Sequence, residues 1–349
     1  MLRTGSGSTG GGRLTYAEIT PGRWLRSYRL SLFGFNRFRH EALDDASSRN
    51  HWMEARDGAE GTASGNFTFL NYWNVNLGFR YKPELLSSTM TRGGPLMVEP
   101  ATRRLEAAVT SDRRRRFSVR PWINHRTGRA GGGITDTGID LSFRPADRIR
   151  ITLDPTYSSA LDVAQYVARF ADPGFEATYG ERYLFSDLRR QTLSVDTRLD
   201  VVFSPRMSLQ FFAQPLVSSG EYQSYKQLMH SSSFDFERLT EGSFFEAKES
   251  ASCAGGRTCV HEGVRYLDLE GDGVASRSIA DRDFLIRSLR SSAVLRWEYR
   301  PGSVAYLVWQ HGRLLRENKH GLAAGDLGRI FDAPMENILI VKLNYWLGI

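Results

Sequence analysis

The chain has 349 residues, of which 41% are hydrophobic and 24% charged, and its formal net charge at neutral pH is +7. This apolar content excludes a wholly disordered chain, and the lack of any run of about 18 uncharged apolar residues excludes a membrane-spanning helix. Two cysteines are too few for a disulfide framework or a cysteine-rich metal centre.

The amino terminus is rich in small residues. Residues 4–12 consist only of glycine, serine and threonine, and we interpret 1–20 as a flexible linker or a truncated upstream segment. No charged stretch followed by a short apolar run is recognisable as a signal peptide. Either the protein is cytosolic or the sequence begins inside a longer protein, and the features that follow favour the second expectation.

From residue 24 onward the dominant pattern is alternation of apolar and polar residues, which is the period of β-strands. Within 73–82, for example, Val75, Leu77 and Phe79 alternate with polar residues, and 193–203 repeats the pattern. The alternation predicts an all-β fold with about twelve strands, at 24–38, 60–70, 73–83, 101–111, 114–125, 133–145, 148–170, 178–203, 206–226, 281–300, 303–316 and 336–349.

The connections between these strands alternate between short and long. The short ones fall near 71–72, 111–112, 146–148, 204–206 and 300–302, and the long ones at about 39–58, 84–100, 126–132, 158–180, 227–280 and 317–335. Short periplasmic turns and long extracellular loops are typical of an antiparallel up-and-down transmembrane β-barrel. A soluble Greek-key sandwich also alternates in hydropathy but has no reason to alternate its loops.

Two further features favour the barrel. Aromatic residues lie beside the short turns, among them Trp73 and Trp297, as in the interfacial girdle of outer-membrane barrels. Charged side chains occupy the middle of strands, which suits a wet lumen. We therefore predict that 21–349 forms an outer-membrane β-barrel, with 227–280 as its longest extracellular loop.

The basic run at 113–116 raises the possibility of nucleic-acid binding. The remaining positive charge is spread along the chain, and a short basic run is usually a solvated turn. We expect no nucleic-acid partner.

The loop at 227–280 contains both cysteines. Cys253 and Cys259 have the spacing of a small disulfide loop, and a metal pair is less favoured because only His261 is near. Asp268, Glu270 and Asp272 resemble the start of a calcium loop, but the closing glutamate is missing, so an acidic turn is the favoured interpretation. We expect no cofactor.

An enzymatic interpretation finds little support. His311 could belong to a barrel hydrolase, but the sequence offers no evident serine or acidic partner. The glycine-rich 127–133 lacks the lysine and following helix of a phosphate loop. The acidic residues of the long loop are scattered, at Asp235, Glu237, Glu241 and Glu246. Whether the protein is an enzyme stays open, with the negative answer favoured.

The last segment, 336–349, is an amphipathic strand of the kind that ends many barrel proteins. Its alternation predicts that Val341, Leu343 and Tyr345 contact lipid while Lys342 and Asn344 face inward. Because a spanning sheet cannot leave an open edge in hydrocarbon, we expect this strand to pair with 24–38. A truncated sequence would leave that closure incomplete.

The alternation also predicts which charged residues line the interior. They are Arg80, Lys82, Asp140, Arg144, Arg150, Asp154, Asp196, Arg198, Asp200, Arg296, Glu298 and Lys342. These residues either form a salt-bridged filling that stiffens a narrow barrel or line a polar conduit. The sequence leaves both alternatives open.

Five stretches resemble one bacterial family, namely 91–95, 182–185, 211–215, 295–303 and 337–347, of which 295–303 is the most specific. The family is an outer-membrane β-barrel domain of unknown function that follows a family-nine-type carbohydrate-binding module. Longer members carry a signal peptide, that module and further upstream strands, which this sequence lacks. The resemblance covers most of the chain, implies that it is the carboxyl-terminal part of a larger protein, and brings no catalytic residues.

These observations lead to one leading hypothesis and two alternatives. The chain is expected to be a porin-like barrel of the bacterial outer membrane that passes or presents small polar or saccharide-like solutes. Its expected partners are outer-membrane lipid and lipopolysaccharide, the barrel-assembly machinery and a saccharide ligand. The alternatives are a surface hydrolase with its site in the extracellular loops, and a structural or adhesion barrel without transport.

Overall fold

The computed structural model describes residues 7–39, 56–247 and 250–347. It is an all-β protein, with 70% of its residues in strands and 3% in helix. Among the described residues, no helix is long and apolar enough to cross a membrane.

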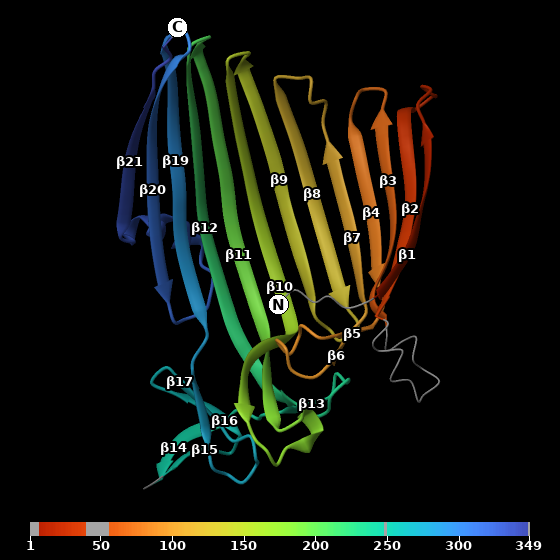
Figure 1. Ribbon diagram of the computed structural model, residues 1–349, viewed down its shortest axis with the longest axis vertical. Helices are drawn as coiled ribbons and strands as arrows, with labels where there is room; N and C mark the ends of the chain where they lie inside the picture. Colours follow the sequence, from red (N-terminus) through yellow and green to blue (C-terminus); the bar gives the residue numbers. More distant parts are fainter. Residues whose placement is uncertain (1–6, 40–55, 248–249, 348–349) are drawn as a thin grey trace.

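Thirteen strands form one antiparallel sheet in which each strand lies beside its neighbour along the chain (Figure 1). The strands are β1 (Gly7–Glu18), β2 (Leu25–Arg39), β3 (Arg56–Phe69), β4 (Asn74–Lys82), β7 (Thr102–Thr110), β8 (Phe117–Gly128), β9 (Gly133–Ala146), β10 (Ile149–Ala171), β11 (Glu181–Ser204), β12 (Met207–Leu228), β19 (Phe284–Arg300), β20 (Ser303–Glu317) and β21 (Met335–Asn344). A short strand, β13 (Phe236–Arg238), pairs with the far end of β12.

The twelve strands from β2 to β21 confirm the twelve predicted from alternation, with ends that differ by a few residues. Of the two interpretations of 1–20, the flexible linker was wrong for the described part, because Gly7–Glu18 forms β1, and the truncated upstream segment stays a prediction. This strand pairs along its whole length with β2. A side chain at Gly11 would meet the carbonyl oxygen of Gly34 and Cβ of Phe35 at 2.8 Å, so the close approach requires glycine there.

The connections at one end of the sheet are all short, and those at the other end are mostly longer. The short turns at 70–73, 111–116, 147–148, 205–206 and 301–302 all lie at one end, uppermost in Figure 1, which we call the turn end. The longer connections, including 83–101, 229–283 and 318–334, lie at the other end, the loop end. The predicted alternation is present in part, because the β8–β9 connection at the loop end, 129–132, has only four residues.

The sheet is not closed among the described residues. β1 pairs only with β2, and β21 pairs only with β20, so both strands have a free edge. The expectation that the last strand pairs with 24–38 was wrong, because β2 already has β1 on one side and β3 on the other. Because the sheet has thirteen strands, residue 7 lies at the loop end and residue 344 at the turn end.

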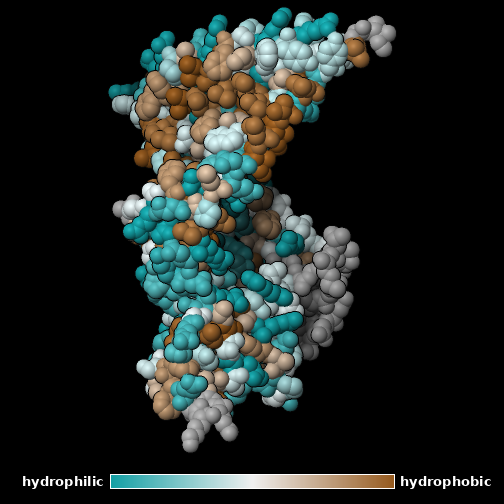
Figure 2. Space-filling view, turned by 90° about the vertical axis from the view of Figure 1, so that its left-hand side faces the viewer, coloured by the Kyte–Doolittle hydropathy of each residue, from teal (hydrophilic) through white to brown (hydrophobic). Residues whose placement is uncertain are grey.

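The register divides the side chains between two faces. The apolar face carries Leu77 beside Ala107 and Ile123 on three successive strands, and large side chains there are left exposed, with Leu77 51% exposed. The polar face carries Asn76 beside Ala108 and Trp122 in the adjacent row. Figure 2 views the molecule from the side of β21 and shows the hydrophobic surface gathered toward the turn end.

At the loop end, the chain covers the apolar face itself. The 3₁₀ segment η2 (Ala324–Asp332) packs Ile330 against Val217 and Leu285 of the sheet. Beside it, the buried Arg287 forms ion pairs with Asp326, at 2.7 Å, and with Glu317. On other strands the apolar face is exposed at the loop end as well, for example at Leu105 and Met335.

Strands β10, β11 and β12 are 22 to 24 residues long and extend beyond the rest of the sheet. Their far ends and residues 229–283 form a second core, which we call the lobe. Val167, Leu184 and Tyr225 of the long strands pack there against three buried leucines of 229–283. The lobe includes η1 (Glu176–Thr178) and the short strands β14 (Ser243–Ala247), β15 (Ser250–Ala254), β16 (Thr258–His261), β17 (Val264–Leu267) and β18 (Arg277–Ala280). Outside the lobe, β5 (Leu85–Ser87) and β6 (Met97–Glu99) form a separate hairpin.

The cysteine pair lies in the lobe. Cys253 of β15 and Cys259 of β16 form a disulfide with Cα atoms 5.5 Å apart. The bond joins two of the small sheets, because β15 pairs with β14 and β16 pairs with β17.

Candidate solute-binding groove

The twelve charged residues predicted to line a lumen all project from the polar face, because the register places them in phase. The sheet is open, so the structure shows a polar face in place of the predicted lumen. Most of these side chains have partners on that face. Lys82 lies 2.6 Å from Glu99, Arg80 lies 3.6 Å from Glu60, and Arg296 lies 3.7 Å from Glu298.

Three further residues of that set contact neutral groups. Arg144 donates to the backbone carbonyls of Arg113 and Arg115 in the neighbouring turn, and Gln214 donates to Asp196 at 2.6 Å. Arg198 lies over the ring of Phe212, 5.5 Å from its centroid. Across the ladder, Asp154 faces Asp196, Arg150 faces Asp200, and Lys342 faces Tyr306.

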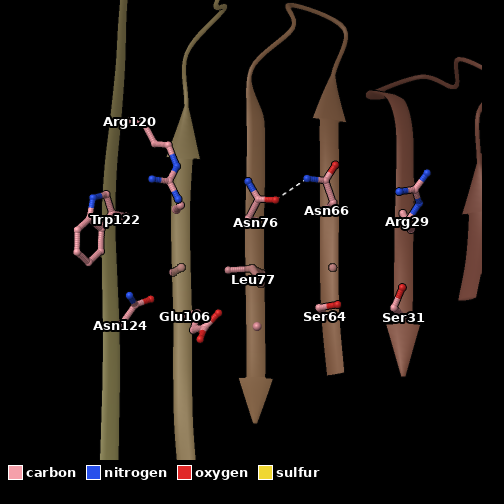
Figure 3. A pocket seen from close by; sticks show the side chains of 14 residues that line it. Arg29, Ser31, Ser64, Asn66, Asn76, Leu77, Glu106, Arg120, Trp122 and Asn124 are labelled. Carbon is pink, nitrogen blue, oxygen red and sulfur yellow. Dashed lines mark hydrogen bonds between the residues drawn. The ribbon is translucent and has the colours of Figure 1, made fainter. Parts of the chain in front are cut away.

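A groove of about 470 Å³ crosses the polar face over β2, β3, β4, β7 and β8 (Figure 3). Its polar side chains come from five neighbouring strands, where they occupy two adjacent cross-strand rows, with Arg120 one row closer to the turn end. They are Arg29, Ser31, Ser64, Asn66, Asn76, Glu106, Arg120, Trp122 and Asn124.

One wall of the groove is a ladder of amides. Asn66 donates to Asn76 at 2.5 Å, and Asn76 in turn donates to Asn74 at 2.6 Å. Asn74 closes the set by donating to Asn66 at 3.0 Å. These bonds hold the amides of Asn66 and Asn76, which line the groove, in a fixed orientation.

The opposite wall is fixed by one carboxylate. Asp140 of β9 accepts from Arg120 at 2.6 Å and from the indole nitrogen of Trp122 at 2.9 Å. The aspartate therefore positions a guanidinium and an aromatic ring at the same time. Arg29, on the far side of the groove, makes no ion pair among the described residues.

The groove as a whole presents amide, guanidinium, hydroxyl and carboxylate groups beside one indole ring. Such a surface can hydrogen-bond adjacent hydroxyl groups while the ring covers an apolar face of a ligand. Of the predicted interior residues, only Asp140 takes part in positioning this groove. Sequence reasoning missed Arg29, Asn66, Arg120, Trp122 and Asn124. The alternation of β2 and β3 could have identified Arg29 and Asn66.

The predicted disulfide between Cys253 and Cys259 is present in the lobe, but the structure brings together neither the calcium candidate nor a site around His311. Asp268 accepts from the backbone nitrogens of Gly271 and Gly273, while Glu270 accepts from Ser276 and Asp272 from Val274. Each carboxylate of the weak calcium candidate thus has a bond within its own turn. Among the described residues, no group of three histidine, cysteine or acidic side chains could hold a metal ion.

His311 lies on the apolar face, where both of its ring nitrogens have partners. Nδ1 is 2.9 Å from Asn337, and Arg313 lies 3.2 Å from Nε2. Ser291 faces His311 across the ladder, but its hydroxyl donates to the backbone carbonyl of that residue. The histidine and serine are therefore not arranged as a nucleophile and its base.

Comparisons with known proteins provide no relative for this fold. No protein-family model, no curated protein and no solved structure matches the chain. The resemblance to the carbohydrate-associated barrel family stays a prediction from sequence.

Proposed function

We propose that the chain forms the wall of a bacterial outer-membrane β-barrel and passes or presents small polar or saccharide-like solutes along its polar face. The observation that carries the proposal is the contrast between the two faces of the sheet. Exposed leucine, isoleucine and aromatic side chains continue across strand after strand on one face, while the other carries the ion pairs and the groove. Soluble monomers rarely expose so continuous an apolar surface.

The strand lengths are compatible with this arrangement. A tilted strand needs about 9 to 11 residues to cross the hydrocarbon region, and β4, β7 and β8 have 9, 9 and 12. The longer β10, β11 and β12 would rise above the membrane and carry the lobe outside. The short turns would then face the periplasm, with outer-membrane lipid and lipopolysaccharide as partners of the apolar face and the barrel-assembly machinery as the route of insertion.

The solute class rests on the groove and on the sequence resemblance together. The amide ladder and the clamped Trp122 offer fixed polar groups and a ring, which is the combination that a saccharide or a similar polyhydroxylated solute requires. The volume of about 470 Å³ accommodates a ligand of that size.

The proposal is tested by conductance of the refolded full chain in a planar bilayer, with sugars added as blockers. We expect discrete channels whose current is reduced by a neutral sugar. In the variant Asp140→Ala, Arg120 and Trp122 lose their shared acceptor. The half-exposed ion pair is worth about 1 kcal/mol, so its loss should make the block by sugar roughly fivefold weaker.

The matched control is Asp136→Ala, because Asp136 projects from the same face of the same strand and makes no ion pair among the described residues. This variant should be blocked as the wild type is. A folded protein without channels would contradict passage of solutes. It would favour the structural barrel, for which the ion pairs of the polar face are the supporting observation.

A further inference from the structure

Four arginines share one cross-strand row on the polar face, closer to the loop end than the groove. Arg80, Arg104 and Arg126 lie directly opposite one another on β4, β7 and β8. The same row continues through Ile134 and Ala160 to Arg190 on β11. Like charges directly opposite each other destabilise a sheet, so the row requires negative charge from elsewhere.

The protein supplies only part of that charge. Glu60 lies 3.6 Å from Arg80, and Glu106 lies 2.7 Å from Arg104. Arg126 and Arg190 make no ion pair and no side-chain hydrogen bond among the residues that the structure describes. These two guanidinium groups are therefore available to an external anion.

Both arginines line one cavity of about 430 Å³. The connection between β5 and β6 reaches into it with Arg92, which lies over the ring of Tyr166 at 4.7 Å from the centroid. Met90 and Phe234 complete an apolar wall beside that ring. The cavity thus combines a cationic side with an aromatic and aliphatic side.

The carboxylates that border the cavity already have partners. Glu99 pairs with Lys82 at 2.6 Å, and Asp162 accepts from the backbone nitrogen of Ala164 at 3.0 Å. Asp162 keeps its negative charge, because a backbone N–H does not neutralise a carboxylate. Three arginines therefore face one carboxylate without an ion pair, and the cavity keeps an excess of positive charge.

The spacing of the row sets the size of the ligand. Arg126 and Arg190 are separated by three strand spacings, which is about 14 Å between backbones. Between them the floor consists of Ile134 and the small Ala160. Two long side chains reaching inward across this gap can hold an oxyanion between them, with space beside it for one sugar-sized ring against the apolar wall.

We propose that this cavity binds a small cyclic organic anion, in which a carboxylate or phosphate is held by Arg126 and Arg190 and the ring packs near Tyr166. The use of this site to select charged solutes rests on the proposed passage of solutes. Binding itself does not rest on it and can be measured separately.

The test is calorimetric titration of the refolded full chain in non-ionic detergent with D-glucuronate, D-glucose 6-phosphate and D-glucose. We expect that at least one of the two anions binds at least tenfold more tightly than glucose. Arg190→Gln should weaken that binding at least tenfold and leave the melting temperature unchanged, and Arg126→Gln provides a second, independent variant.

Arg189→Gln is the matched control. Arg189 is the adjacent residue on the same strand, is also exposed, and projects from the opposite face. The Arg189→Gln variant should bind the anion with the same affinity as the wild type. Equal affinities for the three sugars, no binding of either anion, or an equal loss in the Arg189 and Arg190 variants would overturn the site. If the site fails this test but neutral sugars still pass through the channel, the proposed function remains intact. If the anion binds but no channels form, only the proposed function is overturned.

Discussion

Asp112 closes the turn between β7 and β8 and is nearly buried there, although its neighbours are exposed. It accepts from the side chain of Arg114 at 2.8 and 2.9 Å and from the backbone nitrogen of the same residue at 3.0 Å. Arg114 also lies over the ring of Tyr72 in the next short turn. One aspartate thus holds two turns of the turn end together.

This contact predicts a dependence on acid. The hydrogen bonds from Arg114 lower the pKa of Asp112 to about 2, below its value of about 3.9 in an unfolded chain. Because the folded pKa is depressed, the stabilisation is complete above pH of about 4 and is lost as the pH falls toward 2. We expect the melting temperature of the wild type to fall across this window by more than that of Asp112→Asn.

Asp147→Asn serves as the control, because Asp147 lies in the next short turn along the sheet and has no ion pair among the described residues. It should follow the wild type through the acid window. An identical acid response of the Asp112 variant would contradict the assigned role of the turn.

At the scale of the strand, the two faces of β4 predict opposite responses to the same substitution. Leu77 is 51% exposed, so Leu77→Arg would cost almost nothing if that face met water. In a lipid bilayer, an arginine near the midplane costs about 2–4 kcal/mol. Asn76→Arg on the polar face removes amide hydrogen bonds worth about 1 kcal/mol and introduces no charge into lipid.

The measurement is the free energy of unfolding of each variant in bilayers, compared with the same variants in detergent-free buffer when they remain soluble. We expect Leu77→Arg to be the more damaging of the two in bilayers. Equal costs, or a harmless Leu77→Arg, would show that the apolar face does not contact lipid.

The strands also show where sequence reasoning succeeds and where it stops. Local alternation identified the twelve strands of the main sheet that follow β1, and it identified which side chains share each face of that sheet. The reason is that burial or exposure of one face leaves a period of two in every strand. It missed β1, since Gly10, Gly11 and Gly12 have no side chains to alternate and form a strand only through pairing with β2. It also missed the groove around Trp122, because Pro121 and His125 obscure the alternation of β8.

At the scale of the whole molecule, the pairing of the sheet edges was beyond the sequence pattern, since alternation describes each strand but not its neighbours. In hydrocarbon, the free edges of β1 and β21 would leave unpaired backbone groups that each cost several kcal/mol. An up-and-down sheet of thirteen strands has its first and last strands parallel, so closure by this sheet alone must include one parallel pair.

We therefore expect β1 and β21 to meet in the membrane-inserted protein. Cysteines at Gly10 or Gly12, where a side chain meets nothing within 4 Å, should crosslink to cysteines at Val341 or Leu343 within one chain. Cysteines at Leu30 on the enclosed β2 should not. Crosslinks that form only between chains would contradict closure by this sheet. The absence of crosslinks would also contradict it, provided that the protein is folded, as shown by a difference in gel migration between its boiled and unboiled forms.

The insertion of the lobe between β12 and β19 has a consequence for the order of folding. Most neighbouring strands are joined by connections that bring them together at little entropic cost, so pairing can spread from hairpin to hairpin. β12 and β19 are instead separated along the chain by 229–283, yet they pair from Met207 opposite Trp297 to Gly220 opposite Phe284. We expect this seam to form last, after the lobe has drawn its two ends together, so that the disulfide-bonded lobe determines how fast the two parts of the sheet become one.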